Sequence, residues 1–449
     1  MSGLLQHHDS LMHGWVPVTA QVVTGLVLLA ALRWRRRLVA AAAVGAALAA
    51  TAAHWYVASQ GLAGEPAPHA LWVWIGLTGF AAAALVSGGS GMRWWRRTAA
   101  VAAVPLCALC AALALNLWTG YFPTMQTAWG QLTAGPLPDQ TDMATVAAFQ
   151  VRHAVPRNGS LVPVDTGDAG SGFRHRGELV YLPPAWFASD PPPRLPTVMM
   201  IGGEMNTPAD WARAGNAVQT ADDFAATHGG NAPVLVFADV GGTFNNDTEC
   251  VNGRRGRVAD HLTNDVVPDM ISMFGVSPDP ANWGVVGWSM GGTCAVDLTV
   301  MHPDRFSAFE DIAGDLSPNA GTTAQTIERL FGGDAAAYAA FDPTTVITRH
   351  GRYSGVSGWF AVNGVGASPP PQTAAAAQSL CALGASHGID CAVVSRPGRH
   401  DWPFASGAFA EALPWLAGQI GTPSVPRTAL PQPIRAPSTV QVGDRLPNQ

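Results

Sequence analysis

Four apolar stretches near the N-terminus constrain the fold of this chain more than any other feature. They cover residues 15–32, 38–59, 69–86 and 99–118. About 20 apolar residues are enough to cross a bilayer, where a helix satisfies its own backbone hydrogen bonds. We therefore predict an N-terminal region of four transmembrane helices within residues 1–118. A buried helical bundle in a soluble protein is the alternative.

The arginines between these stretches predict an orientation. "RWRRR" at 33–37 separates the first two stretches and "RWWRR" at 93–97 the last two, whereas the segment before residue 15 and the loop near residue 64 hold no arginine. Basic loops stay in the cytoplasm. The N-terminus and everything after residue 118 are then expected on the extracytoplasmic side of a multi-pass membrane protein. The N-terminus lacks the basic region of a cleaved signal peptide.

Composition narrows the functional classes. Only 12% of the residues are charged and the formal net charge is −6, against about 25% charged residues in soluble domains. No basic patch is evident, so we expect no nucleic-acid partner. The membrane is the expected partner of the apolar region.

Four cysteines lie beyond the apolar region, where an oxidising compartment permits disulfides. Four cysteines allow three connectivities. We favour Cys250–Cys294 and Cys381–Cys391, because the second pair brackets a short connection between a helix and a strand.

The rest of the chain divides into three parts. Residues 119–155 are polar and mixed, typical of a linker, and residues 421–449 are rich in proline and expected to be disordered. Between them, residues 156–420 alternate strand-like and helix-like segments. This alternation predicts an α/β domain with a mostly parallel sheet covered by helices on both faces.

Ser289 lies in "GWSMGGTCAV", where an apolar strand-like run is followed by a helix-like run. Small residues two before and two after a serine allow a sharp strand-to-helix turn that presents a nucleophile. A serine in an ordinary glycine-rich loop is the alternative. The strand and helix on either side favour the nucleophile.

A serine nucleophile needs a base and donors for the oxyanion. His400 follows the last strand-like run, "DCAVV", and is the candidate base. The amide of Met290 and a second amide from the "IGGEM" segment, where Glu204 is preferred and Gly203 permits close approach, are the candidate oxyanion donors.

The acid that would orient His400 is harder to place. The segment after the strand-like run at 357–364 contains no Asp or Glu. Asp315 follows another strand at its carboxyl end and is our choice. Asn363, or a Ser–His pair without an acid, remains open, since asparagine orients histidine in some hydrolases. Asp401 is expected to shape the loop instead.

We expect neither a metal nor a cofactor. The loop "DVGGTFNNDTEC" holds Asp247 and Glu249, but its oxygens match no known calcium loop. A polar loop lining the crevice, with Asp239 at the end of the preceding strand, is the simpler interpretation. No phosphate-binding loop, dinucleotide fingerprint or zinc spacing is present.

The strings "NWGVVGWSMGGTCAVDLTVMHPDRFSAFEDIAG", "LTNDVVPDMISMFGVS" and "GRHDWPF" resemble the Putative esterase family of α/β-hydrolases. That family includes esterase D-like enzymes and the secreted mycolyltransferases of mycobacteria and corynebacteria. The resemblance covers about residues 159–420. It implies an acyl-enzyme formed on Ser289, with His400 as the proton shuttle. The missing acid and the apolar N-terminal region depart from the family pattern.

Three functions are consistent with these residues. The first is a membrane-anchored serine esterase that cleaves acyl esters. The second is an acyltransferase that moves an acyl chain to an envelope sugar, so that only the acceptor differs. The third is a hydrolase fold without catalytic activity that binds a ligand.

Overall fold

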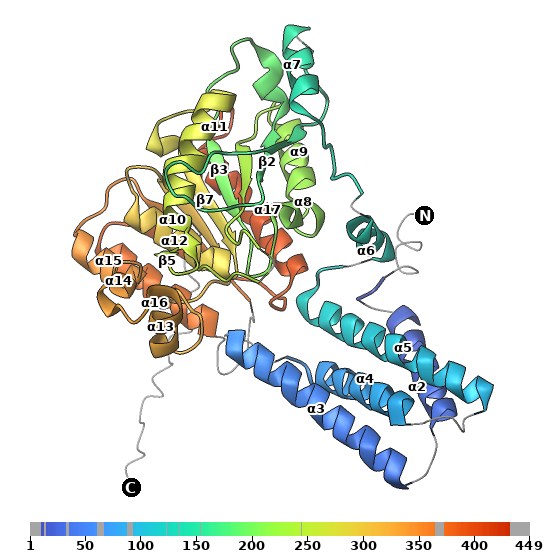
Figure 1. Cartoon of the computed structure of the whole chain (residues 1–449). Coiled ribbons are helices and arrows are strands. Elements are labelled where there is room, and N and C mark those ends of the chain that lie inside the picture. Colours follow the sequence, from blue (N-terminus) through green and yellow to red (C-terminus); the bar gives the residue numbers. More distant parts are fainter. Residues whose placement is uncertain are drawn as a thin grey trace, which may run out of the picture.

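A computed structural model describes residues 10–12, 15–32, 36–60, 67–87, 93–122, 124–133, 135–152, 154–243, 245–363 and 372–431. It contains an arm of N-terminal helices and a body with a central sheet (Figure 1).

The arm consists of four helices, α2 (Trp15–Ala31), α3 (Arg36–Gln60), α4 (His69–Ser87) and α5 (Trp94–Thr119). Helix α3 packs along α4, α4 along α5, and α5 along α2. Large apolar side chains cover the outside of the arm, with Leu48 66% exposed and Trp55 70% exposed. Lipid can cover such a surface, whereas water would oppose it, so the soluble-bundle alternative does not fit.

Three of the four helices, α3, α4 and α5, are long and apolar enough to cross a membrane. Helix α2 has 17 residues, which corresponds to a length of about 26 Å at 1.5 Å per residue. A hydrocarbon core is about 30 Å thick. The described residues therefore contain three helices of spanning length, one fewer than the sequence analysis predicts, because α2 is shorter than the hydrocarbon core is thick.

The region after α5 is more ordered than a plain linker. It holds two short helices, α6 (Met125–Leu132) and α7 (Met143–Val151). Gly120 ends α5 with a left-handed φ of 64°, and the next ring, Tyr121, packs edge-on against Trp402 of the body. The arm is thus joined to the body by packed side chains.

The body is built on an eight-stranded sheet with the order β1-β2-β4-β3-β7-β8-β9-β10. All pairs from β4 to β10 are parallel, whereas β1 with β2 and β2 with β4 are antiparallel. The strands are mostly buried on both faces, as apolar runs in parallel sheets require. Their bounds are β1 (Ser160–Val164), β2 (Glu178–Leu182), β3 (Thr197–Ile201), β4 (Val234–Ala238), β7 (Trp283–Trp288), β8 (Ala308–Ile312), β9 (Ser357–Val362) and β10 (Asp390–Ser395).

Helices cover both faces of this sheet, as predicted. Side chains alternate between the faces, so Val198 and Met200 belong to one core and Met199 and Ile201 to the other. The first core is closed by α8 (Pro208–Arg213), α9 (Ala217–Thr227) and α17 (Trp402–Gln419). The second is closed by α11 (Val267–Phe274), α12 (Met290–Met301), α15 (Pro343–His350) and α16 (Gln372–Ser386).

The remaining elements are short. They are α10 (Val258–Asp260), the π-helix η3 (His261–Val266), α13 (Thr323–Phe331), α14 (Ala335–Ala339), a small hairpin of β5 (Asn252–Gly253) and β6 (Gly256–Arg257), and the 3₁₀-helices η2 (Pro184–Ala188) and η4 (Pro280–Asn282).

The C-terminal segment was expected to be disordered, but its first ten residues pack on α17. Val425 and Leu430 contact the core beneath that helix, and the guanidinium of Arg427 donates to the carbonyl of Gln419 at 3.2 Å. Residues 432–449 lie outside the described residues.

Candidate active site

Ser289 lies at a sharp turn between β7 and α12. Its backbone has φ 58° and ψ −122°, a conformation that costs free energy for a residue with a Cβ and persists where the surroundings enforce it. A Cβ on Gly287 would come within 1.6 Å of the Gly291 carbonyl oxygen, and one on Gly291 within 2.4 Å of the Ile201 carbonyl oxygen. Both glycines are therefore required for the turn, as the sequence pattern predicts.

His400 faces this serine. Its Nε2 lies 2.9 Å from Ser289 Oγ, and its ring packs on Trp288 with 4.2 Å between ring centroids. Burial lowers the pKa of His400 to about 4. The imidazole is therefore neutral at pH 7 and can accept a proton from the serine hydroxyl.

The other ring nitrogen of His400 has no hydrogen-bond partner within the part of the chain that the structure describes. His400 Nδ1 is buried and makes no hydrogen bond to any residue that the structure describes. A carboxylate at this position normally orients the ring and stabilises its charged form. The described residues therefore form a Ser–His pair without an acid at His400 Nδ1.

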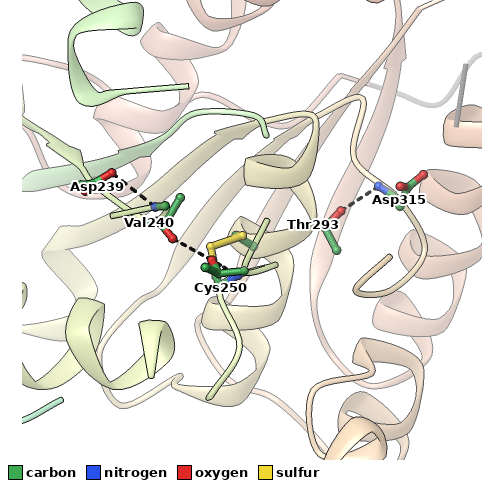
Figure 2. Close-up of a disulfide and its surroundings, with 8 residues drawn as sticks. Asp239, Val240, Cys250, Thr293 and Asp315 are labelled. Carbon is green, nitrogen blue, oxygen red and sulfur yellow. Dashed lines mark hydrogen bonds between the residues drawn. A yellow bond between two sulfur atoms is a disulfide. The ribbon is translucent and has the colours of Figure 1, made fainter. Parts of the chain in front are cut away.

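Asp315 does not take the position of the acid that we predicted for it. Its amide donates to Thr293 Oγ1 at 2.9 Å (Figure 2). Its carboxylate accepts from Asn319 Nδ2 at 2.9 Å. Burial raises the pKa of Asp315. The segment after β8 runs along α12, and this direction, which the sequence does not reveal, holds Asp315 against the helix.

Asn363 and Asp401 were the other two residues discussed for the orientation of His400. Asn363 is buried just after β9, and its side-chain oxygen accepts from Thr373 Oγ1 at 3.4 Å. Asp401 caps α17 by accepting from the Phe404 amide at 3.1 Å, so it shapes the loop that carries His400.

The loop after β3 approaches the serine closely. A Cβ on Gly203 would lie 3.1 Å from Ser289 Cβ. The Gly203 amide already donates to Asn206 Oδ1 at 2.8 Å, which leaves the candidate donors Glu204 and Met290. Met290 is the first residue of α12, and such an amide has no acceptor inside its own helix.

Two residues that we did not predict hold this loop. The guanidinium of Arg176 donates to the Asn206 carbonyl at 2.9 Å and also pairs with Asp239. Asp239 accepts from the Arg176 amide at 2.7 Å as well. A buried aspartate at the end of β4 was the available signal, but its arginine partner, 63 residues earlier in the chain, could not be identified from spacing.

The buried Asp247 and the guanidinium of Arg255 act on the Glu204 side chain. Burial, and after it the nearby charge of Asp247, raise the pKa of Glu204 to about 8, while Arg255 opposes the shift. Asp247 itself pairs with Arg255 at 3.1 Å. The Glu204 carboxyl group is therefore largely neutral at pH 7.

Both predicted disulfides are present. Cys250–Cys294 joins residues 44 apart in sequence, and Cys381–Cys391 residues ten apart. The first one fastens the loop after β4 to α12, one turn beyond Ser289 (Figure 2). In that loop Glu249 and Cys250 have left-handed φ values of 50° and 52°, so the crosslinked turn is conformationally constrained.

A cavity of about 450 Å³ lies next to Asp315, between the segment after β8 and the helices α13, α14 and α16. Hydroxyl and amide groups dominate its polar lining, from Ser317, Asn319, Thr322, Thr323, Thr326, Tyr338 and Ser379. The Asp315–Thr293 hydrogen bond connects its wall to the first turns of the nucleophile helix.

Comparisons with known proteins identify the family of this chain. The sequence model of a family described as "Putative esterase" matches residues 174–416, more than half of the chain. An uncharacterized protein of Corynebacterium glutamicum is 32% identical over 301 residues, which are 64% of this chain and 69% of that protein.

Solved structures are more distant. An S-formylglutathione hydrolase from Agrobacterium tumefaciens superposes with a TM-score of 0.47 at 16% identity, covering 59% of this chain and 97% of that one. MPT51 of Mycobacterium tuberculosis superposes with a TM-score of 0.38 at 21% identity, covering 55% of this chain and 94% of that one.

Proposed function

Because the chain belongs to the Putative esterase family, we propose that it is a serine hydrolase that cleaves carboxylic acyl esters at Ser289. The observation that carries this proposal is the 2.9 Å contact between Ser289 Oγ and His400 Nε2. It occurs at a serine held in a left-handed conformation. Strain of this kind persists at sites where a nucleophile must be presented.

The chemistry proceeds through an acyl-enzyme. His400 Nε2 accepts the hydroxyl proton while Ser289 Oγ forms a bond to the ester carbonyl carbon. The amides of Met290 and Glu204 donate hydrogen bonds to the resulting oxyanion. The C–O bond to the alcohol then breaks, and His400 returns its proton to the leaving oxygen. Water, deprotonated by His400, releases the acid and regenerates Ser289.

The Ser–His pair works without a carboxylate on His400 Nδ1. The buried ring is neutral over most of the pH range, so the Nε2 lone pair is available to accept the serine proton, while the same burial opposes the imidazolium that a carboxylate would stabilise. Contact with the face of Trp288 orients the ring and favours the imidazolium that forms, since aromatic faces attract cations.

We propose that the apolar arm holds this chemistry at a lipid surface, since three of its helices are long and apolar enough to cross a membrane. We assign the hydrolase domain to the extracytoplasmic side, with α2 as a fourth, slightly short span that local thinning of the bilayer accommodates. The arginine clusters at 33–37 and 93–97 support this orientation. The two disulfides support it independently, because they persist in oxidising compartments.

Acyl transfer is the second candidate, and the cavity next to Asp315 favours it. Hydroxyl and amide groups in its lining can donate and accept hydrogen bonds with a polyhydroxylated acceptor. A sugar hydroxyl bound there would replace water in the second step, with the same proton transfers. The substrate class is then an envelope lipid or glycolipid.

A fluorophosphonate probe tests the proposal on the full-length protein in detergent. We expect wild type to be labelled and to hydrolyse short p-nitrophenyl esters, whereas Ser289→Ala does neither. Adding trehalose or an arabinan separates the two candidates, since transfer forms an acylated sugar and hydrolysis forms only free acid. A folded wild-type protein that resists the probe would support the non-catalytic alternative.

A further inference from the structure

His175, Glu178 and His261 form a cluster away from the catalytic pair. One ligand atom from each lies within 4.8 Å of the others. The side chains of Glu178 and His261 are fully buried, and that of His175 is 6% exposed. We propose that this cluster binds a divalent metal ion of the Zn²⁺ type.

The donor atoms converge on one point. His175 Nδ1 and His261 Nε2 each lie 3.2 Å from the same carboxylate oxygen, Glu178 Oε1. Ligands about 2.1 Å from a tetrahedral Zn²⁺ are about 3.4 Å apart. Two imidazoles and a carboxylate form a common zinc ligand set, which leaves a fourth position for water.

The hydrogen bonds of His175 make its Nδ1 available. Its Nε2 lies 3.0 Å from the carbonyl oxygen of Thr166, and because a carbonyl only accepts, Nε2 carries the proton. The Nδ1 lone pair then lies beside the lone pairs of Glu178 Oε1. It accepts one hydrogen bond, from the Gly177 amide at 3.2 Å. A bound cation would replace that amide as the partner of Nδ1. It would lie between the two acceptors, His175 Nδ1 and Glu178 Oε1.

Outer partners of the kind that metal ligands need are already in place. His261 Nδ1 and Asp265 Oδ2 are buried, 3.5 Å apart, and neither makes a hydrogen bond to a residue within the described ranges. With the proton on Nδ1 pointing at Asp265, His261 Nε2 is free to bind the ion. The other Glu178 oxygen accepts from Thr166 Oγ1 at 2.7 Å. Such outer contacts fix the tautomer and orientation of ligands.

The backbone presents His261 in an unusual way. His261 begins the π-helix η3 (His261–Val266), and π-helical turns are rare and frequent at functional sites. Glu178 is the first residue of β2. The ion therefore crosslinks an outer, antiparallel strand of the sheet to the helix that precedes β7.

The site acts on structure and not on the reacting atoms. In the sheet order, β4 and β3 lie between β2 and β7. At the usual strand spacing, β2 and β7 are therefore about 14 Å apart. Its link to the active site is Arg176, which lies between two of the ligands and holds the Asn206 carbonyl. Fixing His175 and Glu178 thus positions the loop that carries Glu204.

Zinc binding by the full-length protein tests the inference without an activity assay. After chelator treatment and dialysis, wild type is expected to bind one equivalent of Zn²⁺ by mass spectrometry and titration calorimetry. With Co²⁺ it is expected to show visible absorption of a four-coordinate site. Glu178→Gln should weaken binding at least 100-fold, and Asp265→Asn, which removes only an outer partner, about 10–100-fold.

His228→Gln is the matched control, because His228 stacks on Phe224 in the outer helix α9, and it should bind zinc as wild type does. Circular dichroism and cooperative thermal unfolding report whether each variant is folded. If Glu178→Gln does not fold, the zinc affinities of the milder variants Asp265→Asn and His175→Gln test the inference instead. Wild type without stoichiometric zinc, or folded variants that bind it with unchanged affinity, would overturn the inference.

Discussion

The two halves of the catalytic pair are held very differently. Ser289 lies in a turn with two indispensable glycines, an amide bonded to the Ile312 carbonyl at 2.9 Å and a disulfide one helical turn away. His400 lies on a loop with one bond to the serine, one ring contact with Trp288 and no hydrogen bond at Nδ1 to any described residue. The nucleophile is constrained by backbone, and the base by side-chain packing.

This difference indicates where the chemistry can tolerate change. A backbone turn permits no alternative residue, so its sequence pattern is strict and can be recognised. A ring held by packing permits several solutions, with or without a carboxylate. Substitutions on the serine side should therefore cost far more activity than substitutions around His400 Nδ1.

The largest effect is expected for Ser289→Ala, which removes the nucleophile but no other contact of the turn. We expect ester hydrolysis to fall by about 10⁴-fold or more, as when a triad serine is lost. Steady-state kinetics on a p-nitrophenyl ester measures this fall, with circular dichroism as the control for folding. If Ser289→Ala lost activity by less than about a hundredfold, the nucleophile would have to be another residue.

Gly287→Ala should come next. The new Cβ would meet the Gly291 carbonyl 1.6 Å away, so the turn must shift, and a displacement of about 1 Å can cost about 100-fold in rate. Thermal unfolding and fluorophosphonate labelling rates measure the effects on stability and on the turn. Gly167→Ala is the control, because its Cβ meets its nearest neighbour at an ordinary 3.8 Å. Equal behaviour of the two variants would contradict the claim that backbone contacts constrain the serine.

Much of the serine side could be predicted from sequence for the same reason. The glycines around Ser289 and the Cys250–Cys294 pair follow from local pattern and topology. Asp315 was misassigned because a position at the carboxyl end of a strand does not reveal the direction of the next segment. Gly203 was proposed near the oxyanion, and only coordinates show that Asn206 already accepts from its amide.

Trp288→Leu is expected to have a moderate effect on the histidine side. Loss of the ring contact with His400 removes a cation–π contribution of about 1–2 kcal/mol to the imidazolium. This corresponds to a fall of about tenfold in kcat with little change in KM. Trp288→Phe keeps an aromatic face and should retain most of the activity. If both variants lose activity equally, the residue acts through packing volume and not through its ring.

The pH profile of kcat/KM tests two buried groups at once. Activity should rise as pH passes about 4, because His400 must be neutral to accept the proton. It should fall about fivefold above pH 8, because Glu204 then becomes a carboxylate close to the oxyanion donors, a repulsion of about 1 kcal/mol. Glu204→Gln should abolish the alkaline decrease and leave the acid limb unchanged. An alkaline decrease that persists in this variant would assign it to another group.

Asp315→Asn is expected to have the smallest effect, and it separates this site most clearly from a triad. Loss of a triad acid costs about 10⁴-fold in kcat. Here the carboxylate accepts from Asn319 and the backbone amide donates to Thr293, and an asparagine can keep both contacts. We expect a change of threefold or less at pH 7, on the scale of a lost exposed contact, in parallel with Asn363→Ala. A fall of 100-fold or more in Asp315→Asn alone would mean that Asp315 reaches His400 during catalysis, and the pair would then have to be regarded as a triad completed by movement of the segment after β8.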